Sequence, residues 1–278
     1  MKTAFVFPGQ GSQSPGMQAE FAEASPLVRD TYEEAGEAVG RDLWTLSREG
    51  SAEELALTEN TQPLMLAAGI AAWRVWRDRG GAEPAWLAGH SLGEYTALVA
   101  AGALAFPDAV RLVAERARFM QEAVAEDAGA MAAVLGLDDE TVRAACAGAA
   151  GSGVVEAVNY NAPGQVVIAG DKAAVERAVE AAKEQGARRA VLLPVSVPSH
   201  CRLMEPAAER LRAALAEVTI GRPAIAVVNN VDVAAESEPA AIADGLVRQL
   251  YSPVRWVETV RFFAAAGADR VVECGPGK

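Results

Sequence analysis

The distribution of apolar and polar positions divides the chain into short apolar runs and longer segments with helical periodicity. The runs are bounded by turn-forming or charged residues, which is typical of buried strands, and they lie within 3–13, 81–91, 224–231 and 270–277. The longer segments space apolar residues three or four positions apart, which predicts amphipathic helices, within 14–40, 60–79, 92–104, 106–127, 204–218, 240–251 and 254–267. This pattern places Pro63 in the first turn of its helix and ends the helix over 14–40 at Gly40.

The order of the predicted elements changes near residue 127. Within 129–195 the segments follow the order strand, helix, strand, strand, helix, strand, which is the ferredoxin-like split βαβ unit. On either side of it strands alternate with helices, which favours a mostly parallel sheet covered on both faces. We therefore expect an α/β protein with a hydrolase-like core formed by 1–126 and 198–278, and a ferredoxin-like (βαββαβ) small subdomain inserted at 127–197.

Composition excludes several classes of function. The formal net charge of −12 argues against a nucleic-acid binder, because phosphate contacts need clustered Lys and Arg. No apolar run reaches the roughly 18–20 residues of a membrane span, and no spacing of Cys or His indicates a metal site. Cys146, Cys201 and Cys274 are far apart and odd in number, so we expect reduced thiols and a cytoplasmic protein.

One motif carries candidate chemistry: Gly89-His90-Ser91-Leu92-Gly93, a G-x-S-x-G pattern. It stands between a predicted strand and a predicted helix, where a sharp turn lifts a serine hydroxyl above the sheet as a nucleophile. The positive N-terminal end of the following helix faces the same point. An ordinary strand–helix turn with a capping serine is the alternative, and the context favours the nucleophile.

A serine nucleophile needs a base, and the chain contains two histidines. His90 is the immediate neighbour of Ser91, and consecutive side chains in a tight turn point to different sides, so its ring is badly placed. His200 lies in a predicted loop, where catalytic groups often occur, and is the favoured base. No acidic residue between Ser91 and His200 stands out as a third triad member, so a backbone carbonyl could orient the imidazole. Cys201 stands beside His200, but a structural thiol is favoured over a catalytic pair.

A second oxyanion donor is also needed, and the Gly-rich turn FPGQGSQ after the first strand is the candidate. Its backbone N–H groups can point into a pocket at the end of the strand. A phosphate-binding loop is the alternative, which the absence of a Walker lysine and of a G-x-G-x-x-G pattern disfavours.

A family resemblance rests on segments spread over essentially the whole chain. They are FPGQGSQ, GHSLGEY, FMQEAV, NYNAPGQVVIAG, VPSHCRLM, NNVD, QLYSPVRW and ECGPGK, in this order and spacing. With them the chain closely resembles the malonyl-CoA:acyl carrier protein transacylases of bacterial type II fatty acid synthesis, whose scaffold polyketide synthase acyltransferase domains share. The resemblance implies a ping-pong transfer in which Ser91 attacks the thioester of malonyl-CoA while His200 takes its proton. The malonyl-serine then passes its acyl group to the phosphopantetheine thiol of acyl carrier protein.

The resemblance also implies roles that the pattern alone leaves unassigned. The backbone N–H groups of Gln10 and Leu92 would hold the oxyanion, and the backbone carbonyl of Gln249 would orient His200. The arginine that pairs with the malonyl carboxylate maps to Arg116, since a guanidinium binds a carboxylate in a planar, bidentate geometry. From the sequence alone Arg116 resembles a solvated helix residue, although it borders the apolar stripe of its helix.

Other interpretations stay open. Arg111 and Arg118 compete with Arg116, and Arg118 is expected to be exposed. Ser199 occupies a position that helps to report acyl choice in polyketide acyltransferases, so a different extender unit is an alternative. A serine thioesterase or hydrolase and a non-catalytic carrier-binding protein are others. The resemblance implies no cofactor, because coenzyme A thioester and phosphopantetheine are substrates; it implies malonyl-CoA and acyl carrier protein as partners, and we expect a monomer.

Overall fold

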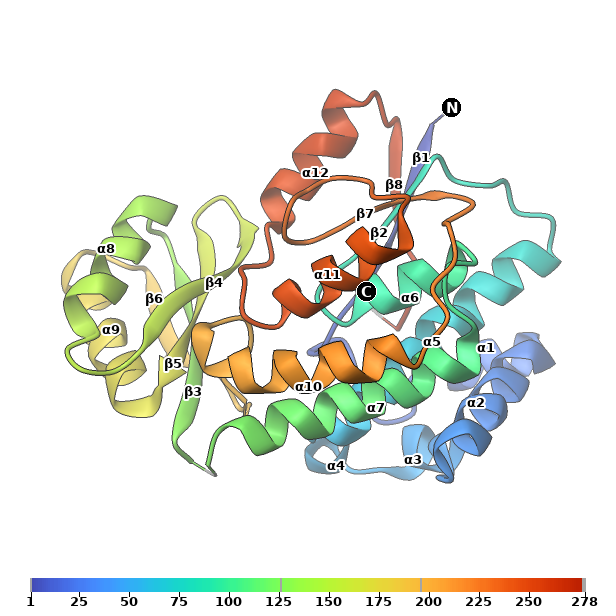
Figure 1. Ribbon diagram of the computed structural model, residues 1–278, viewed down its shortest axis with the longest axis horizontal. Helices are drawn as coiled ribbons and strands as arrows, with labels where there is room; N and C mark the ends of the chain where they lie inside the picture. The colour runs from blue at the N-terminus through green and yellow to red at the C-terminus, as the bar shows by residue number, and fades with distance from the viewer. Residues whose placement is uncertain (1, 126, 196, 277–278) are drawn as a thin grey trace.

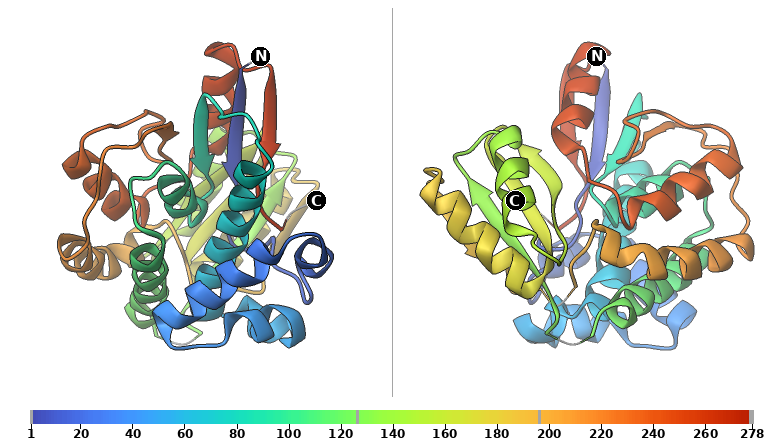
Figure 2. Two further views of the ribbon diagram at one scale, coloured as in Figure 1. Left: turned by 90° about the vertical axis from the view of Figure 1, so that its right-hand side faces the viewer. Right: turned by 60° about the vertical axis from the view of Figure 1, so that its left-hand side comes forward.

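The computed structural model describes residues 2–125, 127–195 and 197–276, which form a larger and a smaller unit (Figures 1 and 2). The larger unit is built on a sheet of parallel strands in the order β7-β2-β1-β8. The strands are β1 (Thr3–Phe7), β2 (Trp86–Gly89), β7 (Ala226–Val228) and β8 (Arg270–Glu273). Strands that far apart in sequence pair in parallel because helical crossovers connect them.

Helices cover both faces of this sheet, as the near-continuous apolar strands require. Phe5 and Phe7 point into the main core, whereas Ala4 and Val6 pack on the other face with Phe263 of α12 (Trp256–Ala265), because successive side chains of a strand alternate between faces. The helices of this unit are α1 (Ala19–Ala24), α2 (Pro26–Val39), α3 (Leu43–Glu49), α4 (Ala52–Ala56), α5 (Thr58–Asp78), α6 (Gly93–Ala100), α7 (Phe106–Ala123), α10 (Glu205–Ala216), α11 (Pro239–Gln249) and α12 (Trp256–Ala265), with the 3₁₀ turn η1 (Arg202–Met204).

The smaller unit, drawn in green and yellow at the left of Figure 1, is an antiparallel sheet in the order β4-β5-β3-β6. Its elements are β3 (Gly129–Leu135), α8 (Asp139–Ala149), β4 (Val155–Ala162), β5 (Gln165–Asp171), α9 (Lys172–Glu184) and β6 (Arg189–Leu192). The first and third strands of the unit lie in the middle of the sheet, which is the ferredoxin-like arrangement. The predicted α/β fold with this inserted unit is confirmed, whereas its limits at 127 and 197 stay a prediction.

Backbone hydrogen bonds join the two units. Val254, in the segment before α12, donates to the carbonyl of Val158 at 2.8 Å, and Tyr160 donates to the carbonyl of Val254 at 3.0 Å. β4 of the smaller unit is therefore held against the larger one. Among the residues the structure describes, no helix combines the length and the apolar character that crossing a bilayer demands.

Two local expectations were wrong. The segment 14–40 forms two helices, because Ser25 is extended before Pro26, as a residue preceding proline prefers to be. The helix over 60–79 begins at Thr58, so Pro63 lies beyond its first turn. Proline there leaves the carbonyl of Glu59 without its helical N–H partner, and Arg41 Nη1 donates to that oxygen at 3.2 Å.

Candidate active site

The turn between β2 and α6 carries Ser91 in a strained backbone conformation. Ser91 has φ 51°, a left-handed value that is uncommon for residues other than glycine and typical of functional turns. The flanking glycines let the backbone segments of this turn pack closely against each other. A Cβ on Gly89 would lie 1.8 Å from the carbonyl carbon of Gly93, and a Cβ on Gly93 would lie 2.2 Å from the backbone oxygen of Phe7. Leu92 is the N-cap of α6, so its N–H lies at the positive end of that helix.

His200 lies against this serine. Its Nε2 is 2.7 Å from Ser91 Oγ, and its Nδ1 is 2.7 Å from the backbone oxygen of Gln249. A carbonyl can only accept, so Nδ1 carries the proton and Nε2 is free to accept the serine hydroxyl hydrogen. Burial, with the charge of Arg116 second, lowers the pKa of His200 to about 3, which keeps the imidazole neutral and able to act as a base.

His90 is engaged elsewhere. Its Nε2 is 2.8 Å from Asn161 Oδ1 of β4, and its ring packs edge-on against Trp256 with centroids 5.4 Å apart. Burial lowers its pKa as well. The geometry therefore pairs Ser91 with His200, and it leaves His90 as a bridge to the smaller unit.

Arg116 is the largest fully buried side chain of the described residues, with 1% exposure. Its Nη1 donates to Gln62 Oε1 at 2.7 Å, and its Nη2 donates to Gln249 Oε1 at 3.0 Å. Nη2 also lies 3.3 Å from Ser91 Oγ. Among the described residues, no carboxylate lies within 4 Å of this guanidinium, and its buried Nε has no acceptor. Arg118, in contrast, is half exposed.

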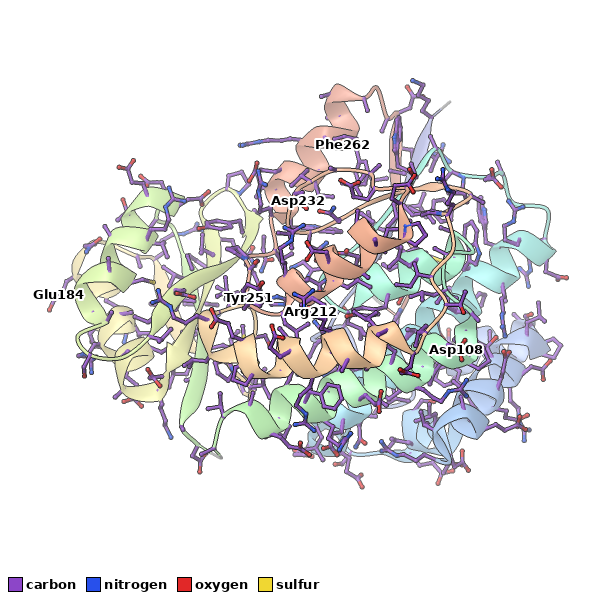
Figure 3. All side chains as sticks on the ribbon, viewed as in Figure 1. Asp108, Glu184, Arg212, Asp232, Tyr251 and Phe262 are labelled. Atoms are coloured by element: carbon purple, nitrogen blue, oxygen red, sulfur yellow. The ribbon has the colours of Figure 1, made fainter. Side chains whose placement is uncertain are left out.

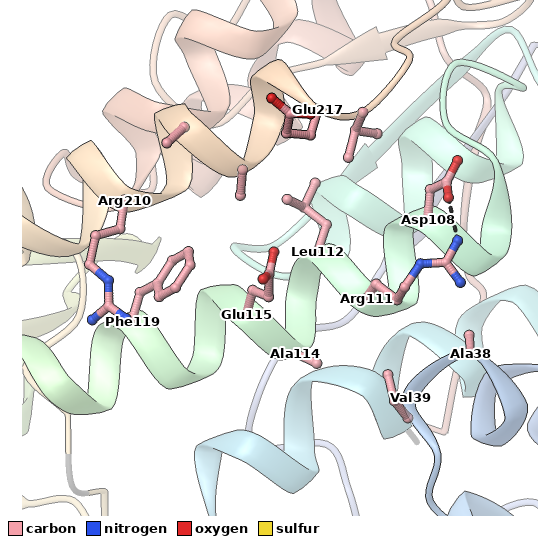
Figure 4. A pocket seen from close by; sticks show the side chains of 13 residues that line it. Ala38, Val39, Asp108, Arg111, Leu112, Ala114, Glu115, Phe119, Arg210 and Glu217 are labelled. Atoms are coloured by element: carbon pink, nitrogen blue, oxygen red, sulfur yellow. Dashed lines mark hydrogen bonds and ion pairs between the residues drawn. The ribbon is translucent and has the colours of Figure 1, made fainter.

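A cavity of about 110 Å³ opens in front of Ser91 and His200. Gln10, which follows β1, lines it together with residues of both units: Thr58, His90, Met131, Asn159, Leu193, Val195, Val197 and Ser199. The larger hollow of about 810 Å³ in Figure 4 lies between α2, α7 and α10; Arg111, which competed with Arg116, lines it, but Ser91, His200 and Arg116 do not. Both arginines that line it are paired with carboxylates, Arg111 with Asp108 and Arg210 with Glu122.

The structure also places three residues at the site that no sequence motif singled out for a role. Gln62 anchors the guanidinium, and Asn230 and Glu94 lie behind the serine turn. Glu94 and Asn230 stand inside the quoted segments GHSLGEY and NNVD, but they are 136 positions apart. No sequence spacing rule predicts a contact between the backbone N–H of Asn230 and the carboxylate of Glu94.

Comparisons with known proteins establish the family of the chain. The acyl transferase domain family matches residues 4–276, so the chain belongs to the acyl transferase family. It is 58% identical to the malonyl CoA-acyl carrier protein transacylase of Salmonella typhimurium over 99% of this chain and 89% of that protein. The Bacillus subtilis protein of the same name is 46% identical over 100% of this chain and 87% of its own length.

Solved structures are equally similar. An acyl carrier protein S-malonyltransferase from Vibrio cholerae superimposes with a TM-score of 0.97 at 55% identity, covering 100% of this chain and 91% of that one. A malonyl-transacylase solved in complex with a type II PKS acyl-carrier protein gives 0.98 at 53% identity, covering 100% of this chain and 90% of that one. These values extend the likeness to the whole fold.

Proposed function

We propose that this chain transfers a malonyl group from malonyl-CoA to the phosphopantetheine thiol of acyl carrier protein, by a ping-pong mechanism through malonyl-Ser91, and so supplies fatty acid elongation. One observation carries the choice of acyl group. Arg116 is a buried cation that has no carboxylate partner among the described residues and lies 3.3 Å from Ser91 Oγ. Burying an unpaired charge is costly, and an acyl group on Ser91 that ends in a carboxylate would pair with it.

In the first half-reaction Ser91 Oγ attacks the thioester carbon of malonyl-CoA, and its proton passes to His200 Nε2. The tetrahedral intermediate collapses as the C–S bond breaks, and His200 returns the proton to the departing coenzyme A thiolate. In the second half-reaction His200 takes the proton of the phosphopantetheine thiol, the thiolate attacks malonyl-Ser91, and the ester C–O bond breaks. Ser91 regains its proton from His200, and the steps need no resident cofactor.

The oxyanion of each tetrahedral intermediate needs fixed donors. We assign the N–H of Leu92 and the N–H of Gln10, because Leu92 begins α6 and Gln10 lines the cavity in front of Ser91. Loss of one such donor typically costs about 3–4 kcal/mol of transition-state stabilisation. The backbone carbonyl of Gln249 orients His200, which explains why no acid is needed for that role.

The relatives' names support acyl carrier protein as the acceptor, and one was solved with its carrier. We also propose that the protein acts as a monomer. Three buried, unpaired cysteines are typical of a reducing compartment, which supports a cytoplasmic location.

The test is a two-stage acyl transfer followed by intact mass spectrometry. Incubation with malonyl-CoA should give a single malonyl adduct, and addition of holo acyl carrier protein should move that group to the carrier. Ser91→Ala should give no adduct. Release of malonate to water without transfer would favour a hydrolase, and a wild-type protein that forms no adduct would leave a non-catalytic binding protein.

A further inference from the structure

A buried carboxylate, that of Glu94, lies behind the site, and the proposed reaction assigns it no role. Its side chain comes from the first turn of α6 and is 3% exposed. Carboxylates are almost never buried to this degree unless polar partners compensate them. The identity of its partners therefore indicates what the carboxylate does.

One oxygen of this carboxylate holds the serine turn through an asparagine. Glu94 Oε2 accepts from the backbone N–H of Asn230 at 2.9 Å. Asn230 Oδ1 in turn accepts from the backbone N–H of Ser91 at 2.7 Å, and Asn230 Nδ2 donates to the carbonyl of Gly89 at 2.7 Å. The loop after β7 is thereby fixed to both sides of the turn that carries the serine.

The same oxygen also orients Gln249. Gln249 Nε2 donates to Glu94 Oε2 at 2.9 Å and to the carbonyl of Ser91 at 3.1 Å. Because the amide nitrogen must face these acceptors, Gln249 Oε1 is left to accept from Arg116 Nη2 at 3.0 Å. The backbone carbonyl of the same glutamine accepts from His200 Nδ1, so Glu94 lies one hydrogen-bonded residue away from the histidine and the arginine.

We propose that Glu94 is a positioning residue of the acyl-transfer site, which acts through Asn230 and Gln249 on the serine turn, the histidine and the arginine. This inference rests on the proposed chemistry at Ser91. The carboxylate has a second effect through its charge. The positive charge of Arg116 opposes proton transfer to the nearby imidazole, and an ionised Glu94 offsets that charge as the proton moves.

The charge of Glu94 depends on pH in the working range. Burial raises the pKa of Glu94 to about 7. The charged groups that face it are Arg116 on α7, which lowers this pKa, and Asp232 in the loop after β7 (labelled in Figure 3), which raises it; Tyr95 on α6 is the neighbouring phenol. Burial lowers the pKa of both histidines, that of His200 to about 3. A change in reactivity near pH 7 would therefore report on Glu94.

The experiment follows modification of Ser91 by methanesulfonyl fluoride, a small neutral probe, with intact mass spectrometry as the readout. An Oγ–S bond forms as the S–F bond breaks, fluoride leaves, and the serine proton passes to His200 and then to solvent. The probe carries no carboxylate and no thioester. The rate therefore reports activation of the serine and not recognition of malonyl-CoA.

Three variants are compared with the wild type. Glu94→Ala removes the acceptor and the charge, and should react about ten- to a hundredfold more slowly, as for loss of hydrogen bonds to a charged group. The wild-type rate should fall as the pH drops through about 7 and reach a lower plateau in acid. Glu94→Gln keeps an acceptor oxygen without the charge, so its rate should equal that plateau and stay flat from about pH 5.5 to 8.5. Glu115→Gln, a half-exposed site on α7, should match the wild type throughout.

The result that overturns the inference is a folded Glu94→Ala protein that reacts within twofold of the wild type, or a Glu94→Gln protein that keeps the wild-type pH profile. If thermal unfolding shows that Glu94→Ala does not fold, the pH profile of Glu94→Gln decides alone. A wild type that neither reacts with the probe nor forms the malonyl adduct overturns the proposed function and this inference together. If it forms the adduct without reacting with the probe, the rate of adduct formation is compared across the same variants instead. A reactive wild type with equally reactive Glu94 variants overturns this inference alone.

Discussion

Replacement of Arg116 by alanine tests the selection of the acyl group most directly. The side chain is 1% exposed, and its guanidinium is held by Gln62 and Gln249 with one Nη 3.3 Å from Ser91 Oγ. A malonyl group on that oxygen would place its carboxylate beside the guanidinium. A buried, hydrogen-bonded charge pair that loses one partner costs about 2–5 kcal/mol. Taking about 3 kcal/mol, kcat/KM for malonyl-CoA should fall roughly a hundredfold.

Acetyl-CoA provides the internal comparison, because the acetyl group has no carboxylate. The same variant should transfer acetyl groups as fast as the wild type or faster, since no buried cation is then left unpaired. The assay measures transfer of each radiolabelled acyl group to holo acyl carrier protein. Arg116→Lys keeps the charge without the planar fork and should still lose at least about tenfold on malonyl-CoA.

The matched control for this prediction is Arg118→Ala, two positions further along α7. Arg118 is half exposed and its ion pairs to Glu115 and Glu122 are long, at 4.0 and 3.9 Å, so both activities should stay within twofold of the wild type. Equal losses on malonyl-CoA and acetyl-CoA in a folded Arg116→Ala protein would refute the reasoning. They would make Arg116 a structural residue and remove the argument for malonyl.

Three further predictions concern the base, the serine turn and acid stability. His200→Ala should slow acylation of Ser91 by several orders of magnitude, whereas His90→Ala should slow it less; the reverse order in stopped-flow assays would reassign the base. Gly89→Ala should unfold at a lower temperature by calorimetry and lose acylation, because its Cβ would lie 1.8 Å from the carbonyl carbon of Gly93; an unchanged midpoint would contradict this close packing. Between pH 6.5 and about 3, His200 is protonated in the unfolded chain but not in the native protein. The free energy of unfolding should therefore fall as the pH is lowered, and His200 contributes up to about 1.4 kcal/mol per pH unit to this fall. Urea titrations of His200→Ala should show a shallower dependence over that window, and an identical slope would mean that the native imidazole titrates normally.

Much of the fold could be predicted from local patterns. Strand–helix alternation, the βαββαβ order and the turn at Ser91 all follow from periodicity and from glycine placement, which act within a few residues. The errors arose where a single residue changes the local outcome. Pro26 broke a helix that the apolar spacing predicts. The helix containing Pro63 began two residues earlier than predicted, and Arg41 donates to the carbonyl that this proline frees.

The candidate site divides in the same way. Ser91 is visible as a motif and His200 by the scarcity of histidines, whereas Gln10, Leu92 and Gln249 act through backbone groups that have no side-chain signature. Arg116 shows the limit most clearly. Its helix pattern favoured a solvated residue, although it borders the apolar stripe, and the resemblance assigned it to the malonyl carboxylate; the structure buries it, with 1% exposure.

The sequence by itself determined most of the elements, the class of fold and the turn that presents Ser91, because these depend mainly on neighbours three or four positions away or on one glycine. Only the tertiary structure decided that His200, 109 positions from Ser91, lies within hydrogen-bond distance of it, and that the carboxylate of Glu94 meets Gln249 and Asn230. The physical reason is that these contacts depend on how the sheet and helices pack. Strand pairing and helix packing bring together residues whose separation along the chain carries no periodic signal.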